Sequence, residues 1–192
     1  MIAQAIYLSH PEVEIDPNTP VPEWGLSGVG RARTAALAAR LGDLSGWSVV
    51  SSGEQKAIET GEPLAALTGK PLIIRADMHE NDRSATGYQP RAAFEALADA
   101  FFAQPDVSVQ GWESARAAQM RIVQEVRAAV LEHPDIPLIF TGHGGVGTLL
   151  YCHLAGHPIS RRWDQTGGGH WFRFAADMSS VEQGWAAMET LS

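Results

Sequence analysis

The chain has 192 residues, of which 45% are hydrophobic and 19% are charged. This composition is ordinary for a globular protein and excludes a disordered or fibrous one. A chain of this length can bury a core without disulfides, since one of ~150 residues already hides about 70% of its unfolded surface. The formal net charge of -8 argues against a nucleic-acid partner, which would need a basic face. It leaves a small phosphorylated substrate open, because a few local cations can hold a phosphate.

Nothing in the sequence indicates an oxidising compartment or a membrane. The single cysteine, Cys152, cannot form an internal disulfide. No apolar run approaches the ~20 residues that span a bilayer, and the N-terminal residues have neither the basic flank nor the length of a signal peptide. We therefore expect a cytoplasmic protein with no membrane segment.

The first half of the chain alternates apolar runs with helical patterns. The apolar run at 2–8 predicts a buried strand that His10-Pro11 ends, and three prolines predict a loop at 14–25. The hydroxyl of Ser27 can cap the free N–H groups of a helix that reaches Leu41. A strand at 47–51, a helix at 54–67 that Gly69 stops, an apolar run at 71–74 and a polar stretch at 76–89 follow.

The second half continues the alternation. We expect helices at about 91–103 and 113–132, a strand at 137–141, a helix at 145–154, a strand at 170–174 and an edge strand at 185–188. Strands that alternate with helices predict an α/β fold: a three-layer sandwich whose mostly parallel sheet has helices on both faces. We expect one domain over residues 1–192, with 76–112 as a candidate cap or lid.

Ligands of open α/β sheets bind beyond the carboxyl ends of the strands. Three polar segments stand at such ends: Ser9-His10, Ser51-Ser52 and Gly142-His143. A lone histidine at a strand end is usually structural, but two at equivalent strand ends favour a functional site. A neutral His10 imidazole could attack phosphorus there. The glycines after His143 would let backbone N–H groups approach an anion at the positive end of a helix.

Five blocks in order resemble the histidine phosphatase (phosphoglycerate mutase-like) superfamily over residues 2 to about 155. "IYLSHPEV" is similar to the strand that runs into Arg-His-Gly, and "LSGVGRARTAALAARL" to the first helix. "VVSSGEQKAIETGEPLA" resembles the block Ser-Ser-x-x-x-Arg-Ala-x-x-Thr-Ala. "MHENDR" resembles the segment that carries the family's acid, and "LIFTGHGGVG" the second-histidine block. Each block alone is loose, whereas the ordered set is specific.

The resemblance implies a role for each matching residue. His10 would accept the phosphoryl group as a phosphohistidine, and His143 would donate to the transferring oxygens. Glu80 would protonate the leaving oxygen and then activate water, which requires a carboxyl group that keeps its proton near neutrality. Phosphoryl transfer needs mainly positioning and cationic stabilisation, so no metal or other cofactor is implied.

The chain departs from the family pattern around the phosphate. Ser9 stands in place of the arginine before the nucleophile, Pro11 in place of the glycine after it, and Lys56 in place of the second arginine. Ser9 removes a charge and a bidentate fork, and Lys56 offers only a point charge. We still expect Ser9, Lys56 and the N–H of Gly144 to bind the phosphate, with Arg83 as a substitute cation.

Other candidate residues have an ordinary structural interpretation as well as a functional one. Arg83 and Asp82 could equally form a solvated loop pair. Ser52 could contact an anion, although a helix cap is favoured, and His170 could face the pocket, although a structural histidine is favoured.

Two further motifs are dismissed. His153 and His157 have a metal-ligand spacing, but Gly156 and Pro158 break the helix there, so we reject a zinc site. The stretch 142–147 fits a dinucleotide-binding pattern, but no buried strand ending in an acid follows it.

The sequence therefore predicts a metal-independent phosphomonoesterase that acts through a phosphohistidine on His10. The alternative from another class is a non-catalytic relative that binds a phosphorylated ligand or a protein. A phosphoglycerate mutase-type phosphotransferase is less favoured, because it must retain a bisphosphate with this thinned clamp.

Overall fold

A computed structural model describes residues 4–192, within which six strands form one sheet in the order β3-β2-β4-β1-β5-β6. The strands are β1 (Gln4–Ser9), β2 (Ser48–Ser52), β3 (Ile73–Arg75), β4 (Leu138–Gly142), β5 (His170–Ala175) and β6 (Ala186–Ala187). The first four are parallel, whereas β5 runs antiparallel to β1 and β6 antiparallel to β5. The start of the predicted strand at 2–8 lies outside the described residues.

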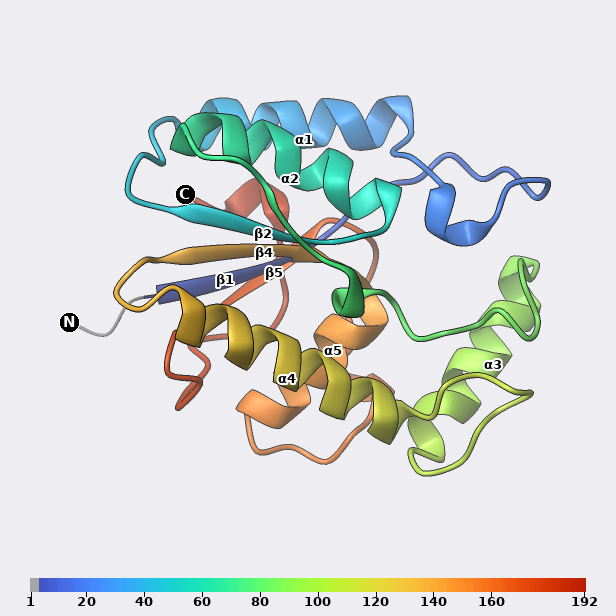
Figure 1. Ribbon diagram of the computed structural model, residues 1–192. Helices are drawn as coiled ribbons and strands as arrows, with labels where there is room; N and C mark the ends of the chain where they lie inside the picture. The colour runs from blue at the N-terminus through green and yellow to red at the C-terminus, as the bar shows by residue number, and fades with distance from the viewer. Residues whose placement is uncertain (1–3) are drawn as a thin grey trace.

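Helices cover both faces of the sheet (Figure 1). The helices are α1 (Gly28–Leu41), α2 (Gln55–Thr68), α3 (Arg91–Ala103), α4 (Ala115–Glu132) and α5 (Gly144–Leu154). The helices α1 and α2 lie on one face, and α4 and α5 lie on the other. The predicted three-layer α/β architecture is confirmed, and among the described strands it is β5, antiparallel to both β1 and β6, that departs from a parallel sheet.

Burial on both faces explains the unbroken apolar strands. Successive side chains of a strand point to opposite faces. Accordingly, Ile6 and Leu8 pack in the cluster with Leu37 of α1 and Leu64 of α2. Their neighbour Tyr7 packs in the other cluster, which contains residues of α4 and α5. A strand buried on both faces reads as a continuous apolar run rather than an alternating one.

Local signals in the sequence set the helix ends. The Ser27 hydroxyl accepts the Gly30 N–H at 3.1 Å, as predicted for a cap. Gly69 ends α2 in the left-handed conformation, at φ 67°. The predicted loop at 14–25 differs in one respect, because a short 3-10 turn forms at Val21–Glu23. Among the described residues no helix is both long and apolar enough to cross a membrane.

The carboxyl ends of β1, β2 and β4 meet at one edge of the sheet. Ser9 lies opposite Gly142, and Ser51 lies opposite Thr141. The loop after β1 and the segment that carries α3 both extend beyond this edge, with β1 pointing between them (Figure 1). The three predicted site segments therefore share one end of the molecule.

Candidate active site

The two strand-end histidines lie side by side. The imidazole centroids of His10 and His143 are 5.3 Å apart, with the rings tilted edge to face. The His10 N–H donates to the Gly142 carbonyl at 2.9 Å, which ties the end of β1 to the end of β4. Parallel pairing of these strands therefore delivers both rings to one place.

The His10 imidazole is oriented by the residue that follows it. Its Nδ1 lies 2.8 Å from the Pro11 carbonyl, which can only accept, so Nδ1 carries the hydrogen. The lone pair is then on Nε2. Burial lowers the pKa of His10, and the neighbouring His143 lowers it further. His10 is thus a neutral imidazole with Nε2 free to act as a nucleophile near neutral pH.

His143 is fully buried and held by Tyr7 and Ser52. The Tyr7 hydroxyl accepts the His143 N–H at 3.1 Å, and the His143 Nε2 lies 2.8 Å from the Ser52 hydroxyl. Burial lowers the pKa of His143, although Glu54 and Glu80 oppose the shift. The Nδ1 atom of His143 is buried without a partner among the described residues. Burial therefore disfavours the charged ring, and one ring nitrogen stays unused.

The Glu80 carboxylate sits at the N-terminus of α5. It accepts the Gly145 N–H at 3.1 Å, the Val146 N–H at 3.0 Å and the Asn81 N–H at 3.1 Å. Burial raises the pKa of Glu80, but His143, Arg83 and the Asn81 N–H outweigh it, so the pKa is lowered. Glu80 is therefore ionised in this structure, and the helix end predicted to face a phosphate already faces a carboxylate.

Arg121 of α4 fixes the backbone on which Glu80 stands. Its guanidinium donates to the carbonyls of Asp77 and His79 at 2.7 and 2.9 Å. The same group pairs with Glu113 at 2.6 Å. A planar fork of donors can hold several acceptors at once, so this arginine is a positioning residue for the Glu80 segment.

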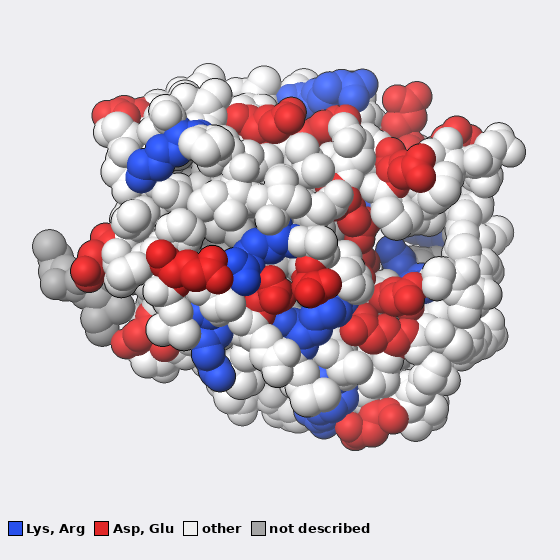
Figure 2. All heavy atoms as spheres, viewed as in Figure 1, with Lys and Arg blue, Asp and Glu red and all other residues white. Residues whose placement is uncertain are grey.

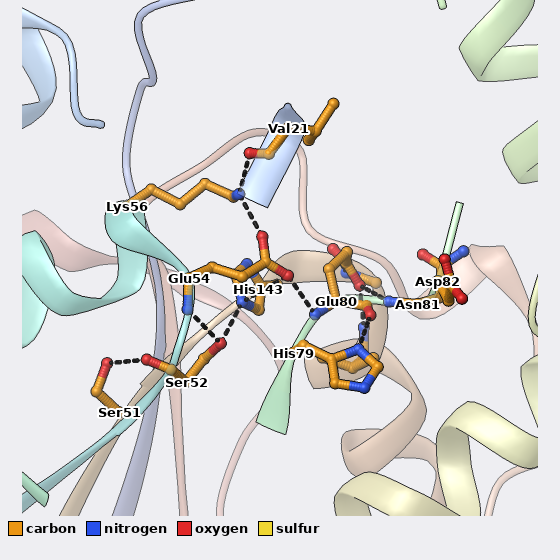
Figure 3. A network of polar contacts seen from close by, with 12 residues as sticks. Val21, Ser51, Ser52, Glu54, Lys56, His79, Glu80, Asn81, Asp82 and His143 are labelled. Carbon is orange, nitrogen blue, oxygen red and sulfur yellow. Dashed lines mark hydrogen bonds and ion pairs between the residues drawn. The ribbon is translucent and has the colours of Figure 1, made fainter. Parts of the chain in front are cut away.

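Lys56 is buried and already paired. Its ammonium contacts the Glu54 carboxylate and donates to the Val21 carbonyl at 2.9 Å (Figure 3). The second oxygen of Glu54 accepts the Glu80 N–H at 2.9 Å and lies 3.6 Å from His143 Nε2. Burial raises the pKa of Glu54, but His143, Lys56 and the Glu80 N–H hold it at about 2. The cation of the expected phosphate clamp is thus already paired with an ionised carboxylate.

Ser9 is buried, and its hydroxyl is engaged with other protein groups rather than open to an anion. Its hydroxyl donates to the Gln165 side-chain carbonyl at 2.6 Å and accepts the His170 N–H at 3.0 Å. Gln165 also lies close to the glycine that opens α5, since a Cβ on Gly144 would come within 2.3 Å of its amide nitrogen. Ser9 therefore joins β1 to the segment before β5. The Nδ1 atom of His170 is buried and has no hydrogen-bond partner within residues 4–192.

Arg83 stands over an aromatic pair rather than in an ion pair. Its guanidinium carbon lies 5.0 Å from the Phe94 ring centroid and 5.8 Å from that of Trp112. Among the described residues no carboxylate lies within ion-pair distance of Arg83, so the alternative of a loop pair with Asp82 does not form. Arg83 is thus a cation without a partner charge.

A cavity of about 840 Å³ opens over Glu54 and Glu80. Its walls come from the loop after β1 and from the segment before α3, and they include both apolar rings and charged groups. The side chains that line it include Trp24, Tyr88, Phe94, Arg83, Arg91 and Asp82. The right-hand side of Figure 2 shows a hollow with basic and acidic side chains around it. The cavity is large enough for a small organic molecule.

The structure brings together His10, His143, Ser52, Glu80 and Lys56. Ser52 does not cap α2, because the N-cap residue is Glu54, but its hydroxyl accepts the Glu54 N–H at 3.3 Å. Four contributors were missed in the sequence: Tyr7, Glu54, Arg121 and Gln165. Tyr7 and Glu54 lie within quoted blocks, Glu54 two residues before Lys56, whereas Arg121 and Gln165 carried no signal. Within residues 4–192 no cluster of three or more His, Cys, Asp or Glu side chains is arranged to hold a metal ion.

Comparison with known proteins identifies the family. The model of the histidine phosphatase superfamily (branch 1) matches residues 16–171, which include Lys56, Glu80 and His143. No curated protein sequence matches the chain. Because the family model covers most of the chain, this protein belongs to the histidine phosphatase superfamily, a class of hydrolases.

Solved structures share the fold at low sequence identity. A mycobacterial glucosyl-3-phosphoglycerate phosphatase in complex with inorganic phosphate is 20% identical, with a TM-score of 0.79 over 98% of this chain and 100% of that chain. Bacillus stearothermophilus YhfR is 18% identical, with a TM-score of 0.80 over 99% and 98%. A phosphoserine phosphatase from Entamoeba histolytica in complex with 3-phosphoglyceric acid is 13% identical, with a TM-score of 0.76 over 99% and 100%.

Proposed function

We propose that this protein is a metal-independent phosphomonoesterase that hydrolyses a small phosphorylated substrate through a phosphohistidine on His10. The observation that carries the proposal is the state of the His10 ring. Its Nδ1–H donates to the Pro11 carbonyl at 2.8 Å, and burial lowers its pKa. A neutral ring with a free Nε2 is the form of histidine that can attack phosphorus.

The same hydrogen bond would support the intermediate. When Nε2 forms a bond to phosphorus and the ester oxygen leaves, the ring acquires a positive charge that Nδ1–H shares with the Pro11 carbonyl. Water then attacks the phosphorus, the N–P bond breaks, and the ring returns to its neutral form. Splitting the reaction at a covalent intermediate makes each step easier than direct hydrolysis.

Glu80 is our candidate for moving the proton. Because Glu80 is ionised in the free protein, we infer that it takes up a proton from solvent when the phosphoryl dianion binds nearby and raises its pKa, and that it then passes this proton to the leaving oxygen. In the second step the carboxylate takes a proton from the attacking water. The three N–H groups around Glu80 favour the ionised form and hence this second role.

The cavity indicates where the rest of the substrate would lie. We propose that the segment 76–112 acts as a cap, since Asn81, Arg83 and Tyr88 line the cavity over Glu54 and Glu80. A space of about 840 Å³ suits a small phosphomonoester. The named phosphatases among the similar structures act on small phosphorylated compounds, which is consistent with this class of substrate.

The test is a trapping experiment. The protein is incubated with a panel of small phosphomonoesters, with and without a metal chelator, and quenched in base. We expect turnover that the chelator does not change and an acid-labile phosphoryl adduct on His10. His10→Ala should lose both, whereas His153→Ala, an exposed histidine at the end of α5, should keep both. An adduct that survives His10→Ala, or turnover that needs a divalent metal, would contradict the proposal.

A second candidate is the non-catalytic relative that binds a phosphorylated ligand or a protein. The observation in its favour is that Glu54 pairs with Lys56 and that the Ser9 hydroxyl is engaged with Gln165. No adduct and no turnover over the whole panel, in a protein that still binds inorganic phosphate, would favour this candidate over the phosphatase.

A further inference from the structure

Glu54 is placed where a helix-capping residue belongs but does not cap. It is the N-cap residue of α2, in an extended conformation, and its side chain caps no backbone N–H of that helix. The side chain turns toward the two strand-end residues Ser52 and His143 and is only 9% exposed (Figure 3). The chain thus gives up a helix cap to bring a carboxylate into the reaction centre.

The partners of this carboxylate are the groups that an anion would need there. One oxygen contacts the Lys56 ammonium, and the other accepts the Glu80 N–H at 2.9 Å while lying 3.6 Å from His143 Nε2. A phosphoryl group bound for attack by His10 would require this cation and these donors. Glu54 therefore behaves as a resident anion of the site.

We propose that Glu54 is a specificity-determining residue, whose carboxylate an incoming phosphoryl group must displace from Lys56. The inference rests on the proposed function for the identity of the ligand. Lys56 attracts a dianion more strongly than the single charge of Glu54, whereas a monoanion gains no such advantage. Glu54 thus selects phosphomonoester dianions against phosphodiesters and other monoanions.

The site leaves room for this exchange. Glu54 both lines the cavity of about 840 Å³ and contacts Lys56, so its carboxylate stands at the boundary between cavity and reaction centre. Lys56 is anchored separately by the Val21 carbonyl at 2.9 Å. When Glu54 turns into the cavity, Lys56 stays in place and faces the ligand together with the Glu80 N–H.

The test compares anion affinities by titration calorimetry. The proteins are wild type, Glu54→Gln and the matched control Glu62→Gln, which changes the same charge at an exposed position of α2. The probes are inorganic phosphate and dimethyl phosphate at about pH 8, where inorganic phosphate is mostly a dianion. We expect Glu54→Gln to bind phosphate roughly 10- to 100-fold more tightly, the scale of one charge-assisted contact.

The second probe tests the selection by charge. Dimethyl phosphate, a monoanion, should bind measurably only to Glu54→Gln. Glu62→Gln should behave as wild type toward both probes. Unchanged or weaker phosphate binding by Glu54→Gln would overturn the inference, and equal dimethyl phosphate binding by wild type and Glu54→Gln would overturn the selection.

Because Glu54→Gln leaves Lys56 without its partner, the variant could fail to fold. Glu54→Gln/Lys56→Gln removes both charges and should lose the gain in affinity. A crystal structure of the wild-type protein with orthovanadate decides the question without any variant. We expect the Glu54 carboxylate to have left Lys56. A structure in which vanadate is absent, or lies beside an intact Glu54–Lys56 pair, would contradict the proposal.

Turnover by the same proteins separates this inference from the proposed function. Tighter phosphate binding by Glu54→Gln without any turnover would support the role of Glu54 and contradict the phosphatase. Turnover by Glu54→Gln with unchanged phosphate affinity would support the phosphatase and contradict the role of Glu54.

Discussion

Tyr7 holds the backbone of His143 from across the sheet, because its hydroxyl lies 3.1 Å from both the N–H and the carbonyl of that residue. The carbonyl has a second partner, the Gly147 N–H at 3.1 Å. In the part of the chain that the structure describes, the N–H has no acceptor besides Tyr7. One buried hydroxyl of β1 thus orients the histidine that follows β4.

Tyr7→Phe should therefore leave the His143 N–H buried without an acceptor. We expect the free energy of unfolding to fall by about 1–3 kcal/mol, the cost of an unsatisfied buried donor. The aromatic stacking of this ring on Phe172, at 5.4 Å between centroids, should survive the change. Urea denaturation measures the loss. Tyr88→Phe, which removes a hydroxyl from an exposed ring, is the control and should be neutral; an equal loss in both variants would contradict the assignment.

Arg121→Lys should lower turnover through Glu80. The lysine keeps the charge but cannot donate to Asp77, His79 and Glu113 together. We expect kcat to fall roughly 10- to 100-fold, the effect of a small misplacement of a catalytic group, with KM little changed. Steady-state kinetics on a substrate from the panel measures both constants. The control is Arg116→Lys, on the same helix as Arg121, because Arg116 forms an exposed ion pair with Asp106. It should leave both kinetic constants unchanged. A change in KM alone would argue against a positioning role.

Arg83→Ala should weaken anion binding. Arg83 lines the cavity, lacks a partner charge, and stands close enough to Glu80 to lower its pKa. If Arg83 contacts the bound phosphate, the loss should be about 1.5–3 kcal/mol in the binding free energy of orthovanadate. Arg127→Ala removes an exposed arginine from α4 and should have no effect. If vanadate binds Arg83→Ala as tightly as wild type, Arg83 contributes only its packing on Phe94.

The buried neutral state of His143 predicts a pH dependence of stability. Since its pKa is lowered in the folded protein, the unfolded chain takes up a proton at this residue below about pH 6.5 while the folded protein does not. Stability should therefore fall as the pH falls from neutral. In His143→Gln this contribution is absent, so the difference in unfolding free energy between wild type and variant should shrink on acidification. Thermal melts across that range measure it, with His133→Gln at the end of α4 as the control. A difference that stays constant would mean that His143 is charged in the folded state.

The sequence predicted the elements well and the reaction edge in outline. Apolar runs and caps such as Ser27 are local signals, and parallel strands must bring His10, Ser52 and His143 to one edge. The contacts that complete the site are not local. Ser9 meets Gln165 across 156 positions of the chain, and Arg121 meets His79 across 42. Neither pairing has a spacing rule, so only the folded chain reveals them.

Glu54 was missed for a different reason. It lies inside a block whose pattern drew attention to Lys56, and an acid at the start of a helix is expected to serve that helix. Whether it turns inward depends on how many acceptors and cations the pocket already holds. The local sequence around Glu54 does not reveal how many acceptors and cations the pocket holds.

The reversed direction of β5 has a consequence for how this protein could diversify. In a purely parallel sheet, only loops that follow strands reach the reactive edge. Here β5 begins at that edge, so the connection from α5 to β5, residues 155–169, also arrives there and delivers Gln165 to Ser9. Asp164 of this connection accepts the Thr148 hydroxyl of α5 at 2.7 Å and Gln165 accepts the Ser9 hydroxyl of β1, so changes outside these two residues would leave α5 and the sheet in place. This connection is therefore the segment in which insertions would reshape ligand recognition at the smallest cost to the rest of the fold.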